Sequence, residues 1–168
     1  MREALIQIVR FVILAAIQIL AFSHFQVVGY GIPFLFLFFV LFLPPYMPRW
    51  QVILLAFLLG FTIDYFSGTY GLYAAGATFI GFLRTRMLKE TVRNFEDDED
   101  ELFHFSDLSI IQFLSYMSLA SFVFSIVFFL FDYFTFSAIL RIGLHVIFST
   151  ASTILCIFIY RYLFASIR

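Results

Sequence analysis

The sequence predicts an all-α integral membrane protein, a six-transmembrane-helix bundle with the N and C termini in the cytoplasm. Three observations predict this fold: the composition, the number of long apolar runs and the placement of the basic residues. The 168 residues are 63% hydrophobic and only 12% charged, with a mean hydropathy of +1.02. Soluble domains carry about 25% charged residues. We therefore expect a single membrane domain over residues 1–168, embedded in the lipid bilayer.

Six apolar runs are long enough to be considered as spans, because a helix needs about 20 residues to cross a ~30 Å hydrocarbon core. They cover approximately residues 4–24, 30–46, 49–66, 70–88, 108–131 and 136–164. Backbone polar groups must find partners within the protein in lipid, and the runs are too long for barrel strands. Helices are therefore the expected structure throughout.

The first run carries Gln7 and Gln18 beside small residues, a stripe typical of helix packing. Arg10 interrupts this run, which argues against a cleaved signal peptide. The second run holds Pro33 and ends in prolines at 44, 45 and 48, so we expect a short helix followed by a rigid turn.

The third and fourth runs meet at a polar, glycine-containing turn. Asp64 falls near the outer end of the third run, and Ser67 and Gly68 follow it. The fourth run contains the small-xxx-small pairs Gly71/Ala75 and Ala77/Gly81, which allow helices to approach closely. Such faces pack either within the protein or against a partner's transmembrane helix. The fourth run ends near Arg84.

Residues 89–107 form the longest hydrophilic segment, predicted to be a cytoplasmic loop. It contains six consecutive acids from Glu96 to Glu101. Two interpretations remain: a solvated spacer between helices, or a docking strip for a basic cytoplasmic partner.

The sixth run contains Arg141 and, one turn later, His145. Charged groups in a membrane usually find partners, so we expect an ion pair between Arg141 and Asp64. The alternatives are that both groups reach the interface separately, or that Asp132 is the partner. The single Cys156 excludes an intramolecular disulfide.

The basic residues support an even number of spans. With six helices and a cytoplasmic N-terminus, nine of the ten Lys and Arg residues fall on the cytoplasmic side, and Arg141 is the tenth. This asymmetry follows the positive-inside rule.

The sequence favours a protein that is not an enzyme. It contains no Gly-x-Ser-x-Gly, Ser-x-x-Lys, His-Glu-x-x-His or phosphate-loop motif. No second His or Cys stands at metal-ligand spacing, and no basic patch indicates nucleic acid. We expect neither a metal nor another cofactor.

The segment from Leu58 to Arg86 resembles the signature of the rod shape-determining protein MreD family. In that family the third helix ends near an Asp, a turn of the Ser-Gly-x-x-Gly-Leu type follows, and the next helix ends in Arg. The matching positions in this chain are Asp64, Ser67, Gly68, Gly71 and Leu72, followed by Ala75 and Arg84.

The resemblance implies a non-enzymatic scaffold of the elongation (rod shape) machinery in the bacterial inner membrane. Such a protein binds an MreC-like periplasmic membrane protein and, through it, is linked to MreB, RodA and a class B penicillin-binding protein. It would support peptidoglycan synthesis along the cell cylinder. MreD proteins are similar in architecture to substrate-binding subunits of energy-coupling-factor vitamin transporters. The alternative is therefore such a subunit, with an outward-facing pocket lined by Asp64, Tyr70, Arg141 and His145.

Overall fold

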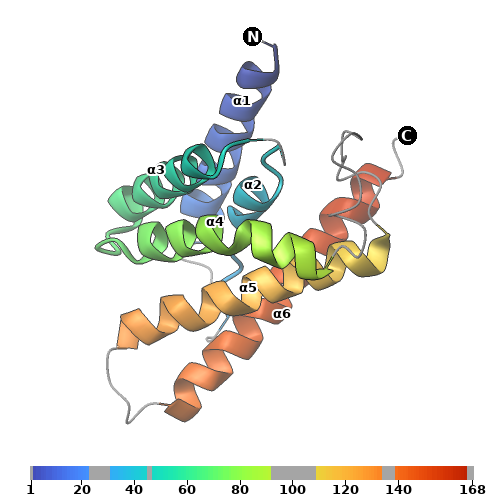
Figure 1. Ribbon diagram of the computed structural model, residues 1–168. Coiled ribbons are helices and arrows are strands. Elements are labelled where there is room, and N and C mark those ends of the chain that lie inside the picture. Colours follow the sequence, from blue (N-terminus) through green and yellow to red (C-terminus); the bar gives the residue numbers. More distant parts are fainter. Residues whose placement is uncertain (1, 23–30, 45–46, 92–108, 134–138, 166–168) are drawn as a thin grey trace.

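The computed structural model describes residues 2–22, 31–44, 47–91, 109–133 and 139–165, and the regular elements within these ranges are helices (Figure 1). The acidic run Glu96–Glu101 lies outside the described residues. The helices are α1 (Arg2–Ile17), which continues as a π-helical turn η1 (Gln18–Phe22), α2 (Leu37–Leu41), α3 (Arg49–Ser67), α4 (Leu72–Thr91), α5 (Ile110–Tyr133) and α6 (Ile139–Ala165).

Three of the described helices are long and apolar enough to cross a membrane by length and composition. The qualifying ranges are Arg49–Ser67 in α3, Ile110–Asp132 in α5 and Leu140–Ile159 in α6. The apolar part of α1, Gln7–Leu20, is shorter. α4 has 20 residues, but its second half carries Arg84, Arg86, Lys89 and Glu90. The described part of the chain is therefore helical, with three candidate membrane spans.

α3, α4, α5 and α6 pack successively against one another in chain order. Two glycines allow the close contacts of α4. A Cβ at Gly60 of α3 would lie 2.6 Å from the Cα of Ala74, and a Cβ at Gly76 would lie 2.5 Å from the Phe124 ring of α5. In lipid, where apolar burial does not drive helices together, such backbone proximity is a principal source of packing energy.

The second run, predicted as a span over 30–46 with a short helix, contains a helix even shorter than expected. Within the described residues 31–44, the helix is limited to the five residues Leu37–Leu41, and residues 31–34 are not helical. The segment is nevertheless in the interior, where Phe34 and Phe36 are completely buried. Non-helical backbone is tolerated at membrane depth only where protein or water supplies its hydrogen bonds.

Polar side chains of neighbouring helices supply those hydrogen bonds. The N–H groups of Ile32 and Phe34 donate to the hydroxyls of Ser149 (2.9 Å) and Thr153 (3.0 Å) on α6. Residue 33 is a proline and has no N–H. The N–H of Leu35 donates to Gln18 Oε1 (3.0 Å). Every N–H group in residues 32–35 is therefore hydrogen-bonded.

Gln18 also donates from Nε2 to the carbonyl of Pro33 (3.1 Å) and is fully buried. Its single amide therefore replaces two hydrogen bonds that a continuous helix would have formed internally. The sequence periodicity could not reveal this arrangement, because buried helix and buried irregular chain are equally apolar.

An aromatic cluster surrounds the non-helical segment. The Phe34 ring packs against Tyr73 of α4 and Phe124 of α5, with centroid distances of 6.1 and 4.7 Å. Phe128 and Phe129 extend the cluster along α5, at 5.3 and 6.3 Å from Phe34. The chain's many phenylalanines thus fill the centre of the bundle around the break as well as covering its outer surface.

Candidate functional site

Asp64 joins the end of α3 to the beginning of α4. Its carboxylate accepts hydrogen bonds from the backbone N–H groups of Tyr73 (3.1 Å) and Ala74 (2.7 Å), and from the Thr69 hydroxyl (2.5 Å). The two amides belong to the first turn of α4, where N–H groups have no partner within the helix. The positive end of the helix dipole also favours a carboxylate there.

The two glycines of the turn have backbone conformations that explain their identity. Gly68 follows α3 with φ +69° and donates its N–H to the Asp64 carbonyl (2.8 Å), ending the helix in the left-handed conformation. Gly71 has φ +94° just before α4. The Ser67 hydroxyl is buried, and no described residue hydrogen-bonds to it. The turn residues predicted from the sequence therefore act together in directing α3 into α4.

The predicted ion pair between Asp64 and Arg141 is not formed. Asp64 is 5% exposed and bonds to the turn, whereas Arg141 is exposed on α6. The amides of α4 provide the compensation for the buried charge that an arginine was expected to provide. His145 lies on α6 with its ring 5.0 Å from that of Phe129.

The outward-facing pocket expected for a transporter subunit does not assemble from its four residues. Asp64 and Tyr70 line a hollow of about 400 Å³ together with Gly68 and Gly71 of the turn and Phe61 and Tyr65 of α3. Arg141 and His145 are not among its lining residues. A site that combined these groups would need α6 beside the α3–α4 turn, whereas α6 packs mainly on α5.

Arg84 holds the other end of the non-helical segment. It is 4% exposed, and its guanidinium donates to the carbonyls of Leu41 (3.4 Å, from Nε) and Leu43 (from Nη2). These carbonyls lie at the C-terminal end of α2, where a helix leaves acceptors unpaired and a cation is favourable. Arg84 thus has a structural role inside the bundle, and the buried Tyr116 of α5 lies beside it.

The small residues of α4 face two different environments. Gly81 is buried, and a Cβ there would lie 3.2 Å from the Cβ of Ala56 on α3. Ala75 is exposed and lines a shallow outer groove of about 750 Å³ between α3 and α4. The groove includes Gly71, Ala74 and Thr78, and phenylalanines on both helices border it: Phe57, Phe61, Phe79 and Phe82. We refer to it as the α3–α4 groove.

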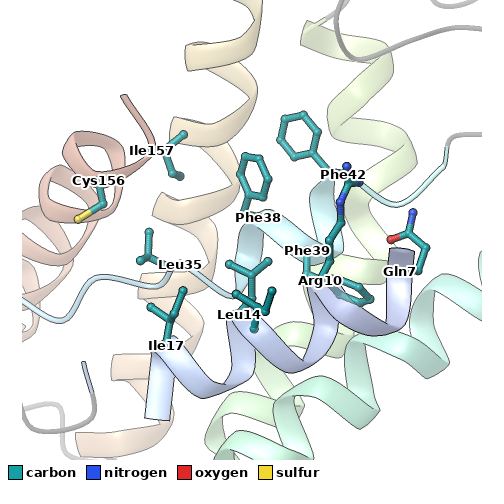
Figure 2. Close-up of a pocket in the computed structure, with 11 residues that line it drawn as sticks. Gln7, Arg10, Leu14, Ile17, Leu35, Phe38, Phe39, Phe42, Cys156 and Ile157 are labelled. Atoms are coloured by element: carbon teal, nitrogen blue, oxygen red, sulfur yellow. The ribbon is translucent and has the colours of Figure 1, made fainter. Parts of the chain in front are cut away.

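A second hollow lies where α1 faces α6 across the segment 31–44 (Figure 2). Its volume is about 300 Å³, and its lining is mostly apolar, with Gln7 and Arg10 of α1 as polar members. Cys156 and Ile157 line it from α6. We refer to it as the α1–α6 cavity.

Sequence reasoning singled out Gln18 for the polar stripe of the first helix, but it missed Ser149 and Thr153. The sequence did contain a sign of their role, because Ser149 and Thr153 are hydroxyl residues four positions apart in an apolar helix. This spacing places both on one face of the helix. The α3–α4 groove and the α1–α6 cavity are hollows that the described geometry offers for binding at the helix surfaces. Comparisons of the chain with protein-family models, with curated proteins and with solved structures returned no match.

Proposed function

We propose that this protein is a non-enzymatic scaffold of the MreD type in the bacterial inner membrane. It would bind the transmembrane helix of an MreC-like partner and so support peptidoglycan synthesis along the cell cylinder. The observation that carries the proposal is the α3–α4 groove, with the exposed Ala75 among its lining residues and exposed phenylalanines along its borders. It lies beside the turn through which the chain resembles that family.

The lining of the groove suits a helix. The groove is an open hollow of about 750 Å³, with small residues of α4 along its floor and phenylalanines of both helices at its borders. Small side chains let a second backbone come close, which is how helices associate in lipid. The large rings of Phe57 and Phe82, 43% and 67% exposed, would pack along the sides of the incoming helix.

The hydrogen bonds of Asp64 give this groove a fixed shape. Because the carboxylate binds the first turn of α4, the angle between α3 and α4 is fixed at the end where Gly71 and Ala75 lie. A preformed surface loses less conformational entropy on binding than a flexible one.

The proposal retains six crossings with both termini in the cytoplasm. Residues 31–44 form the second crossing despite their short helix. Links to MreB, RodA and a class B penicillin-binding protein would be indirect, through the partner.

The experiment compares Ala75→Leu with Ala151→Leu. Both alanines are exposed, on α4 and α6 respectively, so the substitutions are chemically matched, and Ala151 lies outside the groove. The two variants and the wild type are expressed in a rod-shaped bacterium lacking its own MreD, together with the MreC-like protein of this chain's source. Co-purification of the MreC-like protein and cell shape are measured.

We expect Ala75→Leu to reduce the recovered partner about fivefold, corresponding to loss of about 1 kcal/mol of helix packing, and to impair rod shape. Ala151→Leu should behave as wild type. Equal retention of the partner by both variants would remove the groove from the proposal. Failure of the wild-type protein to recover any MreC-like partner or restore rod shape would refute the function itself.

A further inference from the structure

We propose that the α1–α6 cavity is a binding site for one anionic phospholipid, which places an acyl chain in the cavity and its phosphate on Arg10. The inference does not depend on the proposed scaffold function. It rests on the shape of the cavity, its lining and the position of one arginine.

The cavity is apolar along most of its length. Leu35, Phe38 and Phe42 of the segment 31–44 line it between the two helices, and Leu14, Ile17 and Ile157 line it from α1 and α6 (Figure 2). α1 and α6 are not among the element pairs in substantial contact, so the segment separates them.

Shape favours a lipid chain over a helix in this cavity of about 300 Å³. A helix is a rigid rod about 10 Å across, whereas a flexible acyl chain can follow the existing space between α1, α6 and the segment 31–44. Because the chain leaves a hydrocarbon environment, its gain in the cavity comes from close van der Waals contacts with the walls.

The polar lining lies toward one end of the cavity. Gln7, Arg10, Leu14 and Ile17 follow one another along α1, and the Arg10 side chain extends toward Phe42 (Figure 2). Arg10 is exposed, and no residue in the described ranges forms an ion pair with it. A guanidinium binds a phosphate with two parallel hydrogen bonds. Basic pockets between membrane helices are a recognised way of holding acidic headgroups.

The charge of Arg10 is what distinguishes an anionic lipid from a neutral one. A zwitterionic phosphatidylcholine has the same phosphate, but its choline cancels the charge and repels the guanidinium. Gln7, one turn before Arg10, adds an amide that can donate to a second headgroup oxygen. We therefore expect selectivity for the headgroup and tolerance of chain length.

The test is native mass spectrometry of the purified full chain in detergent. Dioleoyl phosphatidylglycerol or dioleoyl phosphatidylcholine is added at equal concentration, and the fraction of protein retaining one lipid is measured. Two substitutions address the site: Arg10→Gln removes the charge, and Ile13→Trp fills the cavity, since Ile13 lines it.

Each substitution has a matched control. Arg49→Gln removes an exposed arginine at the start of α3, outside the cavity. Ile8→Trp adds the same bulk to α1 on its other face, because residues along a helix turn by about 100° each. Ile8 is 61% exposed and Ile13 is 51% exposed, so neither tryptophan is forced into the core.

We expect the wild type to retain phosphatidylglycerol about fivefold more than phosphatidylcholine, the equivalent of about 1 kcal/mol for one basic group. Arg10→Gln should remove this preference, and Ile13→Trp should lower retention of both lipids, while the two controls behave as wild type. Equal retention of the two lipids by the wild type would overturn the proposal. So would an unchanged preference in Arg10→Gln, or equal losses in Ile8→Trp and Ile13→Trp, which would indicate lipid bound around the whole surface.

Discussion

Replacing Asp64 with Ala should destabilise the protein by detaching the first turn of α4 from the end of α3. The substitution removes the acceptor for two buried amides, those of Tyr73 and Ala74, and for the Thr69 hydroxyl. Leaving a buried donor unsatisfied costs about 1–3 kcal/mol. The hydroxyl can rotate to another acceptor, so counting only the two amides gives a loss of roughly 2–6 kcal/mol in the free energy of unfolding. Asp64→Asn keeps one acceptor oxygen and should lose about half as much.

The free energy of unfolding can be measured by reversible denaturation in mixed detergent micelles, with far-ultraviolet circular dichroism as the signal. Asp132→Ala is the matched control, because Asp132 is an exposed acid on α5. Its effect should stay within about 0.5 kcal/mol, as for most surface changes. The losses from Asp64→Ala and Arg141→Ala should add in the double variant, since the two side chains share no contact. A loss from Asp64→Ala no larger than the control, or coupling above about 0.5 kcal/mol with Arg141, would refute the capping role.

Two further predictions use the same measurement. Gln18→Met should lower the free energy of unfolding by roughly 2–6 kcal/mol, because two backbone groups of the segment 31–44 lose their partner. Gln7→Met, at the edge of the α1–α6 cavity, should change it by less than about 0.5 kcal/mol. Gly60→Ala should destabilise by roughly 2 kcal/mol or more, because the added Cβ would lie 2.6 Å from backbone atoms of α4. Gly143→Ala, where a Cβ meets nothing within 4 Å, should be neutral or stabilising. Equal effects within either pair would contradict the packing described.

The helical membrane fold and the α3–α4 turn could be predicted from the sequence because each depends on local information. A helix that must end and reverse within a few residues needs positive φ values, and Gly68 and Gly71 stand where the structure has them. The limits of α3 were also predicted closely, as 49–66 against the observed Arg49–Ser67, because Pro48 precedes the helix and Gly68 follows it. Composition alone predicted the membrane class, and three helices of the described chain have the length and hydropathy that this class requires.

The partner of Asp64 could not be predicted in this way. From the sequence, we considered only charged side chains as partners for a buried acid. We chose Arg141 because Arg141 was predicted to lie at a similar depth in the membrane to Asp64. Backbone amides at the start of a helix carry no formal charge, so we did not consider them, although they bind a carboxylate well. Asp64 is followed by Gly71 and the start of α4 after a short turn, so the nearer partner was the helix itself.

The broken second segment shows how polar residues substitute for helix geometry inside a membrane protein. Pro33 prevents a regular helix from forming its full set of bonds, and Gln18 and Thr153 supply replacements from two different helices. Arg84 then satisfies the carbonyls at the other end. Each of these side chains is buried, so each would be costly without its backbone partner. The requirement is mutual: the segment stays irregular because these groups bind it, and these groups can be buried because the segment is irregular. The same segment lines the α1–α6 cavity through Leu35, Phe38 and Phe42, so the groups that hold the segment in place also preserve that cavity.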